Sequence, residues 1–385
     1  MKKRILSVML VLCMVIGMMP AAFAEDDTSG SVDVTTFADL KTALEAAAAA
    51  DSGDTTINIL NDITLAEGES WSAVNIDGYH GADTITIHGN GHTISGLDAP
   101  LFSGGFAGGS GLVVDRLTLD SVTINDSTSS TGVGAFIGSV DSMDVVSLTD
   151  CHLTNSTITC TGGPRVGGLI GWTSGYNNQN DGPVDTQITI DNCSVENCEI
   201  TSNGSVGGLI GHAGANPATY HTIRNCTVIG NTLTSTDDGG WRVGIVVGTA
   251  NVGELAMDEI TESGNTLAQT DKEAPANTLY GRFVPGDTGT LTIDGTPVFG
   301  SDIVAQNGSS GYKTLSAAVD AAATGDTITL LTDISEDVTI PEGKDITLDL
   351  NGRTMTVPSD CGIEVLGQFT VTDSGESGTI TCTNT

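Results

Sequence analysis

Short runs of alternating apolar and polar residues, separated by Gly, Asn and Asp turns, recur along the middle of the chain. The stretch VGGLIG stands at Val166–Gly171 and again at Val206–Gly211, with looser copies at Val133–Gly138 and Val243–Gly248. Each copy leads through a polar loop to an apolar strand ending in Asx-Cys or a similar pair, and then to a strand rich in Thr and Val. The unit recurs about every 30–42 residues, which predicts a repeat architecture.

Repeats of this length built from β-branched strands predict stacked parallel coils, in which each strand hydrogen-bonds to its equivalents in the neighbouring coils. A β-propeller has repeats of similar length, but every blade needs four antiparallel strands. The units here contain about three short strands and lack tight hairpin signals. We therefore expect an all-β protein, a β-solenoid.

The glycine-rich motif VGGLIG has three interpretations. A phosphate-binding loop needs a helix after the glycines, but Trp172, His212 and Thr249 follow the copies without any helical pattern. A membrane helix contact of the G-x-x-x-G kind needs an apolar run of about 20 residues, and the run here is far shorter. We interpret the motif as a strand that fills and bends each coil. Its structural glycines are Gly167, Gly168, Gly171, Gly207, Gly208 and Gly211.

Aligned repeats place residue columns side by side. In this alignment Ser121, Cys151, Cys193, Cys226 and Ile260 form one column, and Asp120, Asp150, Asn192, Asn225 and Glu259 form the next. We expect the stacked cysteines to be small buried side chains, with disulfides between coils as an alternative. The Asx column predicts a hydrogen-bonding ladder at a bend, with a column of metal ligands as its alternative.

The two ends of the repeat region resemble each other. Phe37–Gly68 and Tyr312–Gly343 each open with an alanine-rich amphipathic helix, break at Gly-Asp-Thr and enter a strand. We expect the first helix to cap a β-helix spanning residues 32–300. The second helix would begin a new helix-plus-β-helix module at 301–385, which we expect to be truncated.

The first residues predict export. Lys2, Lys3 and Arg4 precede an apolar stretch and the small residues Ala22-Phe23-Ala24, the pattern of a secretory signal peptide over 1–24, followed by a flexible leader over 25–31. Without that peptide, the chain would contain ten basic and 48 acidic residues. This balance argues against nucleic-acid binding and against anionic lipid surfaces, and no second apolar run predicts a membrane span. Seven cysteines would remain, without a C-x-x-C pair.

Several motifs together resemble a known family. NGHTISGL (Asn90–Leu97), LFSG (Leu101–Gly104) and the following VGGLIG…NC…V units resemble the GLUG-motif repeats of bacterial cell-surface proteins. The helix-then-GDTI segment with ITLDLNG (Ile346–Gly352) resembles the β-helix starter of large exported proteins of gut Firmicutes. The resemblance covers most of Phe37–Thr385. It implies a right-handed parallel β-helix of the pectate-lyase-like type and an adhesin-like role, and it implies no catalytic residues.

Candidate chemistry gathers just outside the glycine motifs. Arg165 and Arg242 directly precede two copies, with Ser205 at the same place in the copy between them, so the arginines would lie on one coil face about two rungs apart. Arginine with neighbouring carboxylates is the arrangement that a polysaccharide lyase or a glycoside hydrolase would need on this fold. Ion pairs between these arginines and aspartates at a solvated strand edge are the simpler interpretation.

Aromatic residues near the same loops are candidates for stacking on sugars. They are Trp172, Tyr176, Tyr220 and Trp241. The loop NNQNDG, with Asn177 and Asp181, weakly matches a calcium loop. We expect the protein to have no cofactor, with Ca²⁺ at this loop as the alternative. His88 and His92 have a spacing that suits zinc on a helix, but they fall on a turn between strands.

Taken together, the sequence predicts an exported, non-catalytic, adhesin-like β-helix protein of the cell surface. Repeated loops would present side chains to glycans or to host or bacterial surface proteins, with affinity raised by multivalency. The alternatives are a carbohydrate-active enzyme and a purely structural stalk. We expect the chain to be monomeric or part of a longer chain.

Overall fold

The computed structural model describes twelve ranges of the chain, and all structural statements below concern them. They are residues 31–50, 53–75, 83–104, 111–140, 143–174, 186–214, 219–274, 278–284, 290–300, 303–308, 310–358 and 362–382. The protein is all-β with helices α2 (Phe37–Ala48) and α3 (Leu315–Ala321). Within the described ranges, no helix is long and apolar enough to cross a membrane.

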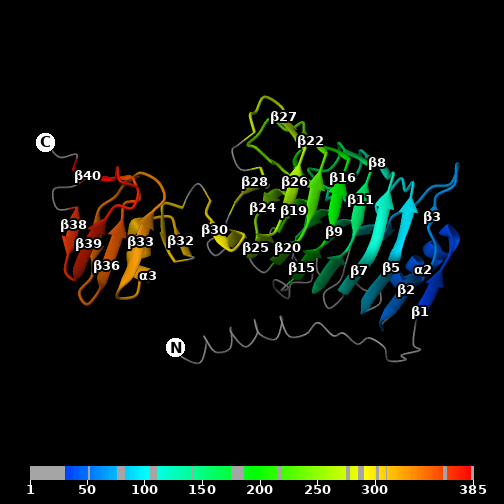
Figure 1. Cartoon of the computed structure of the whole chain (residues 1–385), viewed down its shortest axis with the longest axis horizontal. Coiled ribbons are helices and arrows are strands. Elements are labelled where there is room, and N and C mark those ends of the chain that lie inside the picture. Colours follow the sequence, from blue (N-terminus) through cyan, green and yellow to red (C-terminus); the bar gives the residue numbers. More distant parts are fainter. Residues whose placement is uncertain are drawn as a thin grey trace. The chain divides into compact units, whose positions relative to one another are not determined.

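The central part of the chain winds through coils of short strands that stack in parallel (Figure 1). The coil from Val145 to Thr173 contains five strands, and the next two coils repeat the same five positions. The strands of these three coils are β10 (Val145–Thr149), β11 (His152–Thr154), β12 (Thr157–Cys160), β13 (Arg165–Gly167) and β14 (Ile170–Thr173); β15 (Thr186–Asp191), β16 (Ser194–Glu196), β17 (Glu199–Ser202), β18 (Ser205–Gly207) and β19 (Ile210–Ala213); and β20 (Thr219–Arg224), β21 (Thr227–Ile229), β22 (Thr232–Ser235), β23 (Val243–Gly244) and β24 (Val247–Ala250).

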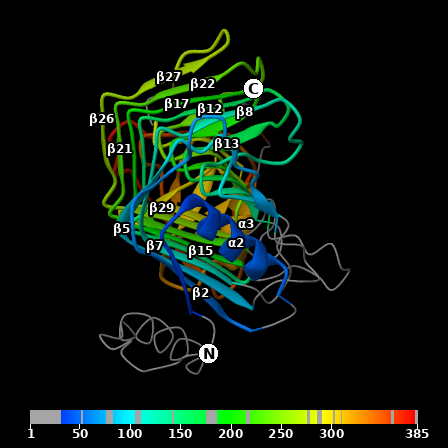
Figure 2. The same cartoon turned by 90° about the vertical axis from the view of Figure 1, so that its right-hand side faces the viewer.

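Coils on either side extend the same ladders. In Figure 2 the strands β8, β12, β17, β22 and β27 lie one behind another, which agrees with their in-register parallel pairing. The flanking strands are β1 (Ser31–Val34), β2 (Thr55–Ile59), β3 (Ile63–Thr64), β4 (Val74–Asn75), β5 (Thr84–Ser95), β6 (Phe102–Gly104), β7 (Gly111–Asp120), β8 (Thr123–Asp126), β9 (Ile137–Val140), β25 (Glu254–Asp258), β26 (Thr261–Ser263), β27 (Thr266–Gln269), β28 (Tyr280–Phe283), β29 (Thr290–Ile293) and β30 (Thr296–Val298).

Left-handed residues mark two bends in each coil. Asp150, Asn192 and Asn225 have φ near +54° between the first and second strands of their coils. Asn155, Asn197 and Gly230 also have positive φ, between the second and third strands of their coils. Asn, Asp and Gly tolerate this conformation best, so these residues set where each coil turns.

The alignment of the first repeat is wrong by four residues. Thr149 pairs with Asp115 and His152 with Thr118, so Arg116 and Leu117, rather than Asp120 and Ser121, are the equivalents of the Asp-Cys pair of the next coil. Ser121 belongs to the second bend, where its φ is +53°. The error arose because two bends in each coil carry similar Asx-containing sequences.

Helix α2 forms where the sequence predicts it. Thr36 caps its N-terminus by accepting from the Asp39 N–H at 3.2 Å, and the Asp39 carboxylate accepts from the Thr36 N–H at 3.1 Å, a capping box. The buried face of α2 includes Leu40 and Leu44, which belong to the same core cluster as the coil interiors.

The C-terminal part has its own buried cluster around α3, built from residues between Ala305 and Val357. Parallel pairs β33–β36–β39, β34–β37–β40 and β35–β38 form its ladders, while β31 pairs antiparallel with β32 and β33. The strands are β31 (Ala305–Asn307), β32 (Ser310–Tyr312), β33 (Asp326–Leu330), β34 (Ile334–Ser335), β35 (Val338–Ile340), β36 (Asp345–Asp349), β37 (Thr354–Val357), β38 (Ile363–Val365), β39 (Gln368–Thr372) and β40 (Thr379–Cys382).

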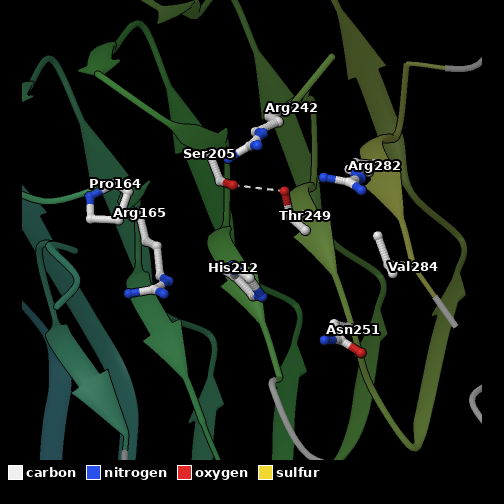
Figure 3. A pocket seen from close by; sticks show the side chains of 9 residues that line it. All are labelled: Pro164, Arg165, Ser205, His212, Arg242, Thr249, Asn251, Arg282 and Val284. Atoms are coloured by element: carbon white, nitrogen blue, oxygen red, sulfur yellow. Dashed lines mark hydrogen bonds between the residues drawn. The ribbon is translucent and has the colours of Figure 1, made fainter. Parts of the chain in front are cut away.

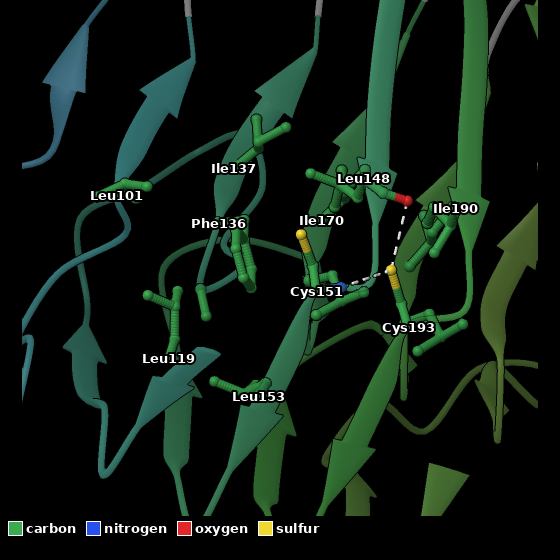
Figure 4. Packing of buried hydrophobic residues seen from close by; sticks show 14 of the residues in the cluster. Leu101, Leu119, Phe136, Ile137, Leu148, Cys151, Leu153, Ile170, Ile190 and Cys193 are labelled. Atoms are coloured by element: carbon green, nitrogen blue, oxygen red, sulfur yellow. Dashed lines mark hydrogen bonds between the residues drawn. The ribbon is translucent and has the colours of Figure 1, made fainter. Parts of the chain in front are cut away.

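Aliphatic side chains and thiols fill the coil interiors (Figure 4). Cys151, Cys193 and Cys226 are buried free thiols in one column, and the Cys151 N–H points at the Cys193 sulfur at 3.4 Å. Burial and the neighbouring Cys193 raise the pKa of Cys226 to about 12. The column therefore consists of small apolar side chains in thiol form, the first of the two interpretations given above.

Candidate functional site

Each VGGLIG copy forms two strands joined by a sharp reversal, not the single strand expected from sequence. In the first copy Val166 and Gly167 end β13, Leu169 is buried in the turn, and Ile170 begins β14. A Cβ on Gly167 would collide with the Ile170 carbonyl, and one on Gly171 would collide with the backbone of Val133. The glycines therefore allow backbones to pack closely, and we call each such unit a glycine arch.

The glycine arches bring the residues before and after them together. Arg165 pairs in register with Ser205, and the adjoining pair Val206–Val243 places Arg242 next along the same column. A second column runs from Trp172 through His212 and Thr249 to Arg282. Because neighbouring strands lie about 4.8 Å apart, Arg165 and Arg242 stand about two rungs apart on one face.

A pocket of about 270 Å³ lies between these two columns. Figure 3 shows Arg165 on one side of Ser205 and His212, with Arg242 and Arg282 on the other. The Ser205 and Thr249 hydroxyls form a hydrogen bond of 2.6 Å within it. We call it the arginine pocket, and its lining residues are Pro164, Arg165, Ser205, His212, Arg242, Thr249, Asn251, Arg282 and Val284.

Two of the arginines are held in place by neighbours. The Arg165 guanidinium lies 4.2 Å from the centre of the Trp172 ring, a cation–π contact. The Arg242 Nε lies 3.2 Å from the Asp237 carboxylate, in a geometry that makes a charge contact and not a directed hydrogen bond. Arg282 is exposed on β28. Arg165 and Arg242 are therefore oriented by Trp172 and Asp237, neither of which lines the pocket.

His212 lies in the middle of this positive wall. Burial, together with the charges of Arg165, Arg242 and Arg282, lowers the pKa of His212 to about 4, although a backbone hydrogen bond to Gly214 acts in the opposite direction. The imidazole is therefore neutral at pH 7. Its Nε2 is buried and has no hydrogen-bond partner among the described residues, so it offers an unused polar atom at the pocket.

Of the residues singled out in the sequence, the structure brings Arg165, Arg242 and Trp172 together. Trp241 is half-buried, and its Nε1 donates to the Val243 carbonyl at 2.7 Å, so it packs on the core. Tyr220 lies on β20, in a different sheet from Trp172. Trp172, Tyr220 and Trp241 therefore lie in separate surroundings. Tyr176, Asn177 and Asp181 lie outside the described residues.

Asn251 and Arg282 also line the pocket, although no sequence pattern pointed to them. Arg282 follows Gly281, which occupies the place of Gly171 and Gly211 in a degenerate further unit. That glycine was the available signal, but the unit lacks the rest of the motif. Strand register alone shows that Arg282 continues the Trp172 column.

Other polar groups form separate contacts. His88 pairs with Asp115, and His92 pairs with Asp62 at 3.2 Å, on either side of an irregularity in β5. The two histidines thus have different partners. Within the described ranges, no three His, Cys, Asp or Glu residues are grouped as metal ligands would be.

Comparison with known proteins identifies the family. The model of a family described as "Putative pectate lyase-like adhesive domain" matches residues 31–235, more than half of the chain. The chain belongs to this pectate lyase-like adhesive family. The matched range contains the glycine arches that carry Arg165 and Ser205, and it ends just before Arg242.

Comparisons with individual proteins add less to this family assignment. The crystal structure of a putative immunoglobulin A1 protease from Bacteroides ovatus aligns with 70% of this chain and 79% of its own, at 17% identity and a TM-score of 0.43. The search of curated proteins gave no match. Membership of the adhesive family agrees with the adhesin-like, pectate-lyase-like part of the sequence prediction, while the GLUG motif and a gut Firmicutes origin stay predictions.

Proposed function

We propose that this chain is an exported, non-catalytic, adhesin-like protein that binds glycans of host or bacterial surfaces in the arginine pocket. The observation that carries the proposal is the match to an adhesive domain over residues 31–235. The scaffold would be a right-handed parallel β-helix with α2 as its N-terminal cap. Parallel in-register ladders and the packing of Leu40 and Leu44 against the core support this scaffold.

The chemistry of the arginine pocket supports binding without catalysis. Glycoside hydrolysis needs a pair of carboxyl groups flanking the scissile bond, and the described residues that line this pocket include no Asp or Glu. Its lining of guanidinium groups, hydroxyls and an amide suits hydrogen bonding to a saccharide. The pocket volume of about 270 Å³ is near the lower end of ligand pockets, so it would hold one sugar residue.

Glycan binding by the full chain on a glycan array and on mucin tests the proposal. We expect binding, and we expect Asn251→Trp to abolish it, because a bulky ring would fill the pocket. Asn203→Trp is the matched control, since Asn203 is exposed and lies outside the pocket. Equal binding by both variants would move the site elsewhere.

Parallel assays for reducing ends and for unsaturated sugars test the non-catalytic part. Product release from plant or mucin glycans would show a carbohydrate-active enzyme instead. A protein that binds no glycan and no surface protein would be a structural stalk.

A further inference from the structure

The charge of the arginine pocket is opposite to that of the molecule around it. The whole chain carries 48 Asp and Glu against 13 Lys and Arg, a net charge of −35. Three of those few basic residues, Arg165, Arg242 and Arg282, line this one pocket. A cleft with one sign of charge concentrates ligands of the other sign.

The positive potential is focused at a definite place. His212, between Arg165 and Arg242 in the stack, feels the charges of all three arginines, which is why each of them disfavours its protonation. Among the described residues, the Asp237 carboxylate contacts Arg242 at 3.2 Å. A ligand in the pocket would meet the guanidinium groups of Arg165, Arg242 and Arg282.

Guanidinium groups recognise particular anions. Arginine donates in a planar fork that matches carboxylate and sulfate oxygens. The Ser205–Thr249 pair adds a donor, because only one of the two hydroxyl hydrogens is used in their mutual 2.6 Å bond. The neutral His212 Nε2 would accept a hydrogen bond from a sugar hydroxyl.

We propose that the arginine pocket binds the single acid group of a terminal anionic sugar, a carboxylate or a sulfate ester. This inference rests on the proposed adhesive function and names its ligand class. A polyanion is disfavoured, since the acidic surface of the rest of the molecule would repel every charge outside the pocket. One acid group on an otherwise neutral glycan meets the guanidinium groups without that repulsion.

Four probes distinguish a carboxylate ligand, a sulfate ester, a neutral sugar and a polyanion. They are 3′-sialyllactose, 3′-sulfolactose, lactose and polygalacturonate. With the full chain in buffer containing EDTA, isothermal calorimetry should show at least one acidic lactose binding about tenfold or more tightly than lactose, which corresponds to about 1.4 kcal/mol. The better of the two identifies the carboxylate or the sulfate. Equal affinity for lactose, or tighter binding of polygalacturonate, would overturn the inference.

Charge-removing variants locate the binding. Arg165→Gln and Arg282→Gln should each lower the affinity for the acidic probe by about 10- to 100-fold, as expected for lost hydrogen bonds to a charged group. Arg224→Gln is the matched control: it removes the same charge from β20, where Arg224 pairs with Asp191 at 2.8 Å. Equal weakening by the control would contradict a pocket effect. Arg282 is exposed, so its substitution tests binding even if Arg165→Gln perturbs the fold.

The outcomes also separate this inference from the proposed function. Neutral glycans bound on the array, with no preference for the acidic probes, would refute the anionic ligand and leave the adhesive role standing. No binding on the array and no heat of binding in the calorimeter would refute both the anionic ligand and the proposed function.

Discussion

Gly167, Gly207 and Gly244 occupy the same place in three successive glycine arches. A Cβ at each would collide with a backbone carbonyl of its own arch and come within about 2.7 Å of the nitrogen of a glycine in the following coil: Gly211, Gly248 and Gly281 respectively. Real Cβ atoms do not approach so closely, so one glycine in each coil makes room for another in the next. This pairing explains why the motif is half glycine.

Gly167→Ala should therefore destabilise the protein by about 1–3 kcal/mol, the range found for overpacked interiors. The methyl group has only backbone around it, which cannot move without separating two coils. Urea unfolding followed by circular dichroism measures the change in the free energy of unfolding. Gly240→Ala is the control, because a Cβ there has nothing within 4 Å; a similar loss in both variants would show that the loss is not caused by crowding.

At the scale of the strands, the sequence predicts the repeat, the parallel stacking and helix α2, because these depend on local periodicity and on capping residues such as Thr36 and Asp39. It does not predict five strands in a coil, since strands of two to four residues carry too little alternation to be seen. It places Arg165 and Arg242 on one face, in agreement with the register. The pocket also needs Thr249 and Arg282, which join it only through the register of the β14 column.

Asn231 and Asn265, at the second bends of two successive coils, form an amide ladder that sequence alignment did not show. Buried Asn231 accepts from the Cys198 N–H at 2.8 Å and donates to the Val195 carbonyl at 2.8 Å. Asn265 accepts from the Asn231 N–H at 3.0 Å and so continues the ladder into the next coil. These side chains satisfy backbone groups that the bend removes from the strand ladders.

Asn231→Ala should reduce the free energy of unfolding by about 1–3 kcal/mol or more, because it leaves the Cys198 N–H and the Val195 carbonyl buried without partners. Asn203→Ala removes a comparable amide bond, to the Thr161 carbonyl at 2.9 Å, from an exposed position. We expect a much smaller effect there. Chemical denaturation of both variants measures the difference, and equal losses would contradict a special role for the buried ladder.

Across the whole molecule, electrostatics acts in two opposite senses. The excess of 48 acidic over 13 basic residues produces self-repulsion that opposes the folded state. The arginine pocket, in contrast, depends on attraction between unlike charges. Salt screens both interactions over a Debye length of about 10 Å at 0.1 M, so one change of solvent should move folding and binding in opposite directions.

Raising NaCl from 10 mM to 500 mM at pH 7, with EDTA present, should increase the melting temperature while weakening the binding of the acidic probe. The first effect follows from screened repulsion among carboxylates, and the second from screened attraction to Arg165, Arg242 and Arg282. Near the isoelectric point of about 4.1 the repulsion largely vanishes, so there the melting temperature should hardly respond to salt. Scanning calorimetry and binding titrations at matched salt concentrations measure both effects.

A melting temperature at pH 7 that does not change with salt would show that close pairs such as Arg224–Asp191 outweigh the net charge. An affinity for the acidic probe that does not change with salt would show that neutral hydrogen bonds, not guanidinium charge, hold the ligand.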